Sequence, residues 1–138
     1  MIAADPAGLE RFVRASLLLS FGLNVAAAYV FAHPSSVVGA QLGLSPAADP
    51  LYAGLSAMLV ALFGCAYGWL AMQPVIDQPL LWVGVVGKAG FFVLVAALWM
   101  RGAANDRLVL AASADMAFAA FWFWWLIRTR HAASGSDR

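Results

Sequence analysis

Four apolar segments, each long enough to cross a lipid bilayer, constrain the fold of this chain more than any other feature. A helix rises about 1.5 Å per residue, so roughly 20 apolar residues span a hydrocarbon core of about 30 Å. The pattern predicts an all-α integral membrane protein with four transmembrane helices. These spans cover about 11–32, 51–73, 79–100 and 107–128.

Residues that favour helix N-termini support the starts of all four spans. Asp5-Pro6 precedes the first span, and Asp49-Pro50, Gln78-Pro79 and Asn105-Asp106 stand where the second, third and fourth spans begin. An Asp or Asn side chain accepts hydrogen bonds from the first free amides of a helix, and proline at the first helical position sacrifices no bond.

Composition agrees with a single membrane-embedded domain, which we expect to cover residues 1–138. The chain is 64% hydrophobic and only 11% charged, whereas a soluble domain carries about 25% charged residues. A net charge of +1 without a basic stripe gives no nucleic-acid surface. Cys65 is the single cysteine, which excludes an intramolecular disulfide and a Cys-x-x-Cys pair. Its apolar neighbours predict a buried, inert thiol.

The distribution of arginine predicts the orientation, because basic residues in short flanking segments are retained on the cytoplasmic side. Two arginines fall on one side of the predicted spans, Arg101 and Arg107. The other side carries Arg11, Arg14, Arg128, Arg130 and Arg138. We therefore expect a multi-pass protein whose helices form an antiparallel bundle, with both the N- and the C-terminus in the cytoplasm. The run FWFWW at 121–125 is interpreted as an interfacial anchor.

The segment 33–50 is the only long connection between the predicted spans. Val37, Val38, Leu42 and Leu44 make it too apolar for a freely solvated loop. We expect an interfacial or re-entrant segment on the non-cytoplasmic face, where these side chains would be buried. Two roles stay open for it, a lid over the bundle and a cap that only joins two spans.

Lys88 and Asp115 need an explanation, because each lies in the middle of an apolar span. An ionised side chain at mid-bilayer costs about 2.5–3.5 kcal/mol on insertion scales, so it needs a partner or a function. Counted from the cytoplasmic side, Asn24 and Asp115 lie at the same depth, near the midplane. Lys88 begins roughly 6 Å nearer the cytoplasm, at a level that Tyr67 also reaches. We predict a polar centre of Asn24, Tyr67, Lys88 and Asp115.

The sequence does not determine whether Lys88 and Asp115 contact each other directly. Helical side chains lean toward the N-terminus, which directs these two residues in opposite directions. A direct ion pair therefore requires strain, and a bridge through Asn24 or a water molecule is the alternative.

Small and polar residues indicate which helix faces point inward, because helices in lipid associate by close packing and hydrogen bonding. The GxxxG pair Gly64–Gly68 fits a homodimer face and equally a contact inside the bundle. The residues assigned to inward faces are Ser16, Ser20, Asn24, Ala28, Ser56, Val60, Gly64, Gly68, Gly84, Gly87, Gly90, Ala111, Ala112 and Ala119.

Three interpretations of the polar centre remain open. The charged residues form a structural ion pair that fixes helix packing, or they form the site of a proton- or ion-coupled small transporter acting as a homodimer. In the third interpretation they anchor an amphipathic ligand, such as a quinone or a lipid. No nucleophile–base pair, metal cluster or cofactor loop favours an enzyme, so we predict no catalytic residue and no metal. The expected partners are the lipid bilayer and either a second copy or a larger membrane complex.

The order of these features resembles that of small four-helix bacterial membrane proteins of the DoxX-like group. The shared features are the Pro- and Gly-containing stretch HPSSVVGAQLGLSP, the spacing from Gly64 to Tyr67, the pair Gly87-Lys88 and the acidic Asp115. The resemblance covers most of the chain and implies a four-helix, multi-pass protein of the bacterial inner membrane. Some members of this group are linked to quinone-dependent sulfur oxidation or to redox and membrane homeostasis, which implies a quinone or lipid ligand.

Overall fold

The computed structural model describes residues 6–134, and the side chains of residues 7–129. This part of the chain is helical and contains no strand. Its helices are α1 (Pro6–Ala32), α2 (Val37–Gln41), α3 (Pro50–Met72), α4 (Gln78–Met100) and α5 (Asp106–Ser134). The four long helices are each long and apolar enough to cross a membrane, which confirms the all-α class and the four predicted spans. Arg138 and the side chain of Arg130, both used to predict orientation, lie outside the described part, and so does Asp5, which was used to predict the start of the first span.

Side-chain caps define the starts of α3 and α4. At the start of α3 the Asp49 carboxylate accepts the amide of Leu51 at 2.8 Å. At the start of α4 the cap is Asp77 rather than Gln78, because its carboxylate reaches the amide of Leu80 at 2.9 Å. Each cap satisfies an amide that has no partner within its helix.

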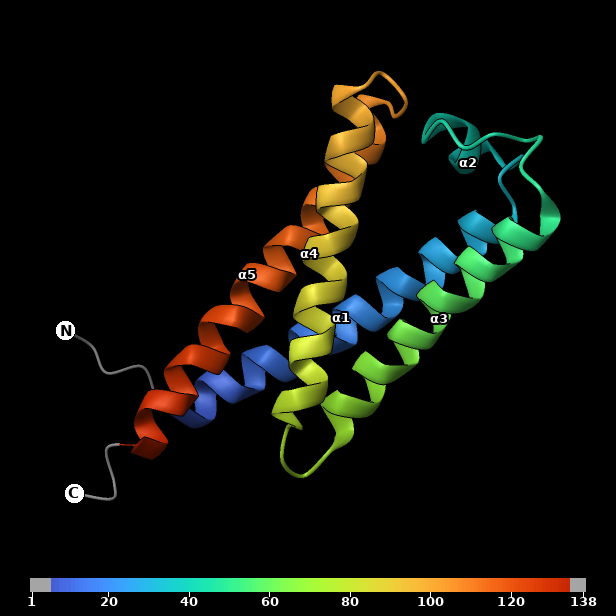
Figure 1. Cartoon of the computed structure of the whole chain (residues 1–138). Coiled ribbons are helices and arrows are strands. Elements are labelled where there is room, and N and C mark those ends of the chain that lie inside the picture. Colours follow the sequence, from blue (N-terminus) through green and yellow to red (C-terminus); the bar gives the residue numbers. More distant parts are fainter. Residues whose placement is uncertain (1–5, 135–138) are drawn as a thin grey trace.

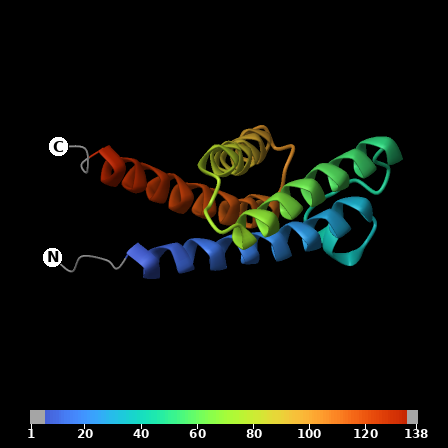
Figure 2. The same cartoon turned by 90° about the horizontal axis from the view of Figure 1, so that it is seen from below.

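The four long helices group into two pairs, as Figures 1 and 2 show. α1 lies along α3 with the opposite chain direction, and α4 crosses α5 in the same antiparallel sense. Most contacts between helices fall within these two pairs, and α3 and α4 share far fewer. The pairs diverge toward the end of the molecule where α2 lies (Figure 1).

The buried core fills the half of the molecule next to the loop 73–77, and every long helix contributes to it. Its aromatic members are Tyr67 from α3 and the larger Trp122 and Trp125 from α5. The remaining core residues are Val13, Leu17, Leu70, Ala71, Ile76, Leu81, Val85, Ala119 and Leu126. One end of the molecule is therefore closely packed, whereas the helix pairs separate at the other end.

The outer surface of the four helices is apolar. At most 28% of the apolar window in each candidate span is buried inside the protein. Large side chains such as Leu62, Val86 and Leu110 are exposed at 59%, 67% and 74%. Since a water-soluble protein rarely exposes a continuous apolar surface of this extent, the arrangement indicates a multi-pass membrane protein.

The connection between α1 and α3 docks on the α4–α5 loop. The Asn105 amide donates to the carbonyl of Gln41 at 3.0 Å, and its oxygen accepts the amide of Leu108 at 2.9 Å. Gly43 has a positive φ of 77°, and a Cβ there would lie 2.9 Å from the Asn105 nitrogen. Within this segment Val37 and Val38 are exposed, whereas the side chains of Leu42 and Leu44 turn toward the space between the helix pairs.

Several residues lie differently from their predicted positions. Cys65 is exposed on α3 and is not buried, because it lies opposite the helix face that carries the buried Tyr67 and Leu70. Ser56, Gly90 and Ala111 were predicted to face inward, but all three are exposed. Each lies toward the end where the helix pairs separate, so no neighbouring helix covers it.

Arg14 connects the start of α1 to the end of α3 through hydrogen bonds. Its guanidinium donates to the carbonyls of Ala71, Gln73 and Pro74 at 2.9, 2.5 and 3.0 Å, and it pairs with Glu10 at 2.6 Å. The last carbonyls of a helix have no partner within the helix, so the side chain satisfies groups that the fold leaves open.

Replacing Arg14 with alanine is expected to lower the free energy of unfolding by about 1.5–3 kcal/mol, the usual contribution of hydrogen bonds to a charged group. Thermal unfolding in detergent measures the change. Arg11→Ala is the control, because Arg11 is exposed one turn earlier. Equal stability of the two variants would show that the Arg14 contacts contribute nothing.

Candidate functional site

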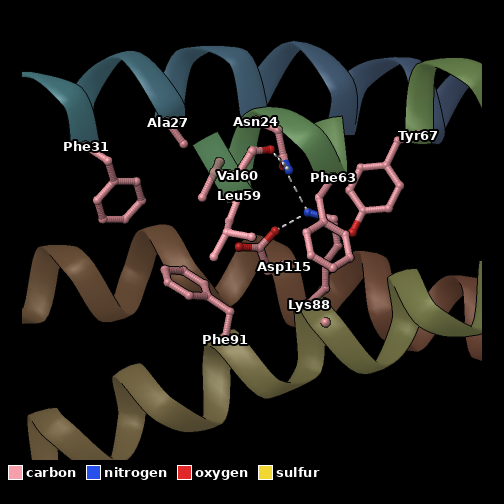
Figure 3. Close-up of a pocket in the computed structure, with 11 residues that line it drawn as sticks. Asn24, Ala27, Phe31, Leu59, Val60, Phe63, Tyr67, Lys88, Phe91 and Asp115 are labelled. Carbon is pink, nitrogen blue, oxygen red and sulfur yellow. Dashed lines mark hydrogen bonds and ion pairs between the residues drawn. The ribbon is translucent and has the colours of Figure 1, made fainter. Parts of the chain in front are cut away.

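Lys88 lies at the boundary between the packed core and the diverging half of the molecule. Its side chain extends from α4 toward α1 and α5 (Figure 3) and is only 5% exposed. The ammonium contacts the Oδ1 atom of Asp115 directly, and it donates to the Asn24 amide oxygen at 3.5 Å. The Asn24 amide nitrogen donates in turn to the carbonyl of Val60 at 3.1 Å. The polar centre therefore connects all four long helices.

The ion pair is direct, and Asn24 supplements it rather than bridging it. The backbone positions of Lys88 and Asp115 lie at different depths in their spans, so the sequence did not determine whether the two side chains contact each other. The long lysine stem spans this difference. Lys88 and Asp115 thus neutralise each other inside the protein.

Three aromatic rings surround the Lys88 ammonium on its core side. Its nitrogen lies 5.2 Å from the ring centroid of Tyr67, 5.3 Å from that of Phe118 and 5.9 Å from that of Trp122. A cation within about 6 Å of an aromatic face is attracted to the ring, most strongly where water is excluded. Tyr67 joins the predicted polar centre through this ring face.

Trp122 is a buried core residue, which corrects its interpretation as part of an interfacial anchor. It is 0% exposed, and its indole N–H donates to the Ser16 hydroxyl at 2.8 Å. Within the same run, Trp124 is exposed at 45%. A sequence signal could have found the buried residues, since Phe118 and Trp122 follow Asp115 at spacings of three and seven and so share its helix face.

Two glycines allow the helices to approach closely enough to form the site. A Cβ on Gly64 would lie 2.9 Å from the Asn24 Cβ, and a Cβ on Gly84 would lie 2.8 Å from a ring carbon of Tyr67. Gly68 packs in the same way against the Phe21 ring. The GxxxG pair of α3 is therefore used against α1 of the same chain.

Two cavities meet at the polar centre. The first, the aromatic cavity of about 240 Å³, is lined by four aromatic rings, including those of Phe63 and Tyr67, and contains Lys88 at its polar end. The second, of about 340 Å³, is aliphatic and extends toward Leu42 and Leu44. Both are lined by Asn24, Ala27, Phe31, Phe91 and Asp115. The aromatic rings of Phe31 and Phe91 contact each other edge to face across the two helix pairs, as Figure 3 shows from the side.

The site retains hydrogen-bonding capacity that the described residues do not use. Asp115 binds Lys88 through Oδ1, whereas its second oxygen points away from Lys88, toward Phe31 and Phe91 (Figure 3). The hydroxyl of Tyr67 forms no hydrogen bond with another described residue. One acceptor and one hydroxyl group are therefore available to a ligand.

The chemistry of these side chains suits binding. All four predicted residues, Asn24, Tyr67, Lys88 and Asp115, line the aromatic cavity. Among the described residues, no three His, Cys, Asp or Glu side chains are grouped as they would be around a metal ion. The site offers a neutralised ion pair, an amide and a phenol at the end of apolar walls.

Comparisons with protein-family models, curated proteins and solved structures found no match to this chain.

Proposed function

We propose that this protein is a small multi-pass bacterial inner-membrane protein of the DoxX-like type that binds an amphipathic molecule, such as a quinone or a lipid, at the Lys88–Asp115 centre. Its four spans form an antiparallel bundle with both termini in the cytoplasm. Its role is that of an accessory or ligand-binding protein rather than an enzyme.

One observation carries this proposal, the meeting of a polar centre and apolar cavities between the two helix pairs. Ligand pockets are typically apolar concavities with a few polar groups that fix orientation. Here the walls are aromatic and aliphatic, and the polar groups all lie together beside Lys88. A purely structural ion pair needs neither the cavities nor the unused oxygen of Asp115.

Native mass spectrometry of protein extracted from its own membrane tests the proposal. We expect an adduct of constant mass, and we expect Tyr67→Phe to weaken its retention roughly fivefold, because the variant removes one hydrogen bond worth about 1 kcal/mol. The protein itself loses no internal hydrogen bond in this variant, so its stability should not change. Tyr52→Phe is the matched control, since Tyr52 is exposed on the same helix and lines neither cavity. Absence of an adduct, or equal retention by both variants and by Lys88→Met, would contradict the proposal.

Proton- or ion-coupled transport is the second candidate function, and the position of Asp115 is the observation that favours it. Asp115 lines both cavities, and carboxylates inside a membrane are used as proton relays in pumps and transporters. Because Gly64 and Gly68 contact α1, a transporting homodimer would have to use a different surface. Substrate-driven proton uptake into vesicles, lost in Asp115→Asn, would support transport.

A further inference from the structure

The two cavities differ in lining but share their polar junction. The first contains the rings of Phe63 and Tyr67, whereas the second is formed by aliphatic side chains such as Leu23, Leu42 and Leu108. Asn24 and Asp115 belong to both linings. A molecule that occupies both cavities therefore places its polar group at this junction.

The charge of this junction is balanced. Among the described side chains, Lys88 and Asp115 are the only formally charged ones that line either cavity, and they contact each other. An additional charge buried beside them would lack a partner, and an unpaired charge in an apolar site is strongly disfavoured. An uncharged head group avoids this cost. A hydroxyl on that head group would also donate to the second oxygen of Asp115.

The volume of the cavities limits the rest of the ligand. At about 240 and 340 Å³ they fall at or below the lower end of the usual range of roughly 300–1,000 Å³ for ligand pockets. The aliphatic cavity thus suits one hydrocarbon chain rather than the two chains of a phospholipid.

We infer that the joined cavities select a single-chain amphiphile with an uncharged, hydroxyl-bearing head group over an anionic one, and that the charge balance of Lys88 and Asp115 sets this selectivity. The inference rests on the proposed binding function and names the class of ligand for the same site. Its physical basis is that each charged residue cancels the field of the other at the junction.

The test compares two probes of equal chain length, dodecanol and dodecane-1-sulfonate, with the full-length protein in phosphatidylcholine nanodiscs. Retention of each probe is measured relative to empty nanodiscs, which corrects for partition into lipid. We expect the wild-type protein to retain the alcohol at least roughly tenfold better than the sulfonate. Equal retention of the two probes by the wild-type protein would overturn the inference without using any variant.

Charge variants provide the second arm. Asp115→Asn leaves the Lys88 cation unbalanced, so the preference should shift toward the sulfonate by roughly tenfold or more. Lys88→Met leaves Asp115 unbalanced and should instead favour dodecyltrimethylammonium. Variants are compared only when their helical circular dichroism matches that of the wild-type protein. An unchanged alcohol-to-sulfonate ratio in folded Asp115→Asn would contradict the inference.

The outcomes separate the inference from the proposed function. If a native adduct is found but dodecanol does not bind, the ligand class is wrong and the binding function stands. If neither the adduct nor any probe is retained, both are wrong.

Discussion

Asp115→Asn is expected to destabilise the protein by about 3 kcal/mol, and by more than Lys88→Met does, because removing one partner leaves the other charge buried. The difference between the two variants follows from the exposure of the charged side chain that remains in each. The Lys88 side chain is 5% exposed and would remain enclosed by aromatic rings, whereas the Asp115 side chain is 26% exposed and faces the cavities. The free energy of unfolding in detergent–denaturant mixtures measures both changes.

The double variant Lys88→Met/Asp115→Asn is expected to recover at least half of the free energy of unfolding that Asp115→Asn loses. The reason is that the double variant removes both charges and so leaves no unpaired charge buried. Asp49→Asn is the control for the same chemical change. Asp49 is exposed and caps α3, and asparagine caps a helix about as well as aspartate. Additive losses in the double variant would show that the two residues do not depend on each other. Full recovery of stability together with loss of a bound adduct would indicate an ion pair that also binds a ligand.

Gly64→Ala is expected to lower stability by about 1–3 kcal/mol and to displace Asn24 from Lys88. The added Cβ would lie 2.9 Å from the Asn24 Cβ. That atom is fixed to the backbone of α1, so α1 and α3 must move apart. The variant should therefore weaken both the fold and any ligand binding at the polar centre.

Gly54→Ala is the matched control for this prediction, on the same helix. A Cβ at Gly54 would meet no atom within 4 Å. Alanine is favoured over glycine in a helix by up to about 1 kcal/mol, so this variant should be equal to or more stable than the wild-type protein. If thermal unfolding in detergent gives the same result for both variants, the close approach of α1 and α3 at Gly64 is not needed.

The sequence could place the predicted site residues at similar depths in the membrane, because the depth of a residue depends only on the rise of its helix. Asn24, Tyr67, Lys88 and Asp115 all line one cavity in the structure. The depth of each residue could not determine which side-chain atoms are in contact. The contact of Lys88 with Asp115 depends on the direction of a long, flexible side chain, and residue spacing along a helix does not fix that direction.

The sequence also could not determine which aromatic residues of the last span are buried. The abundance of tryptophan near the end of the last span is equally compatible with an interfacial anchor and with a packed core. The difference depends on how α5 is rotated about its axis against its neighbours. In the structure that rotation buries Trp122 against Ser16 and leaves Trp124 exposed.

The sequence by itself determined the helical class, the four spans and most helix boundaries, because each follows from local hydropathy and from caps such as Asp49. It also identified Lys88 and Asp115, since a charge in an apolar span is visible without any structure. Only the tertiary structure decided that α1 pairs with α3 and α4 with α5, that Gly64 contacts α1 and that two cavities meet at the ion pair. The reason is that the surfaces of apolar helices are nearly alike in hydropathy, so their pairing depends on close packing between residues far apart in the chain.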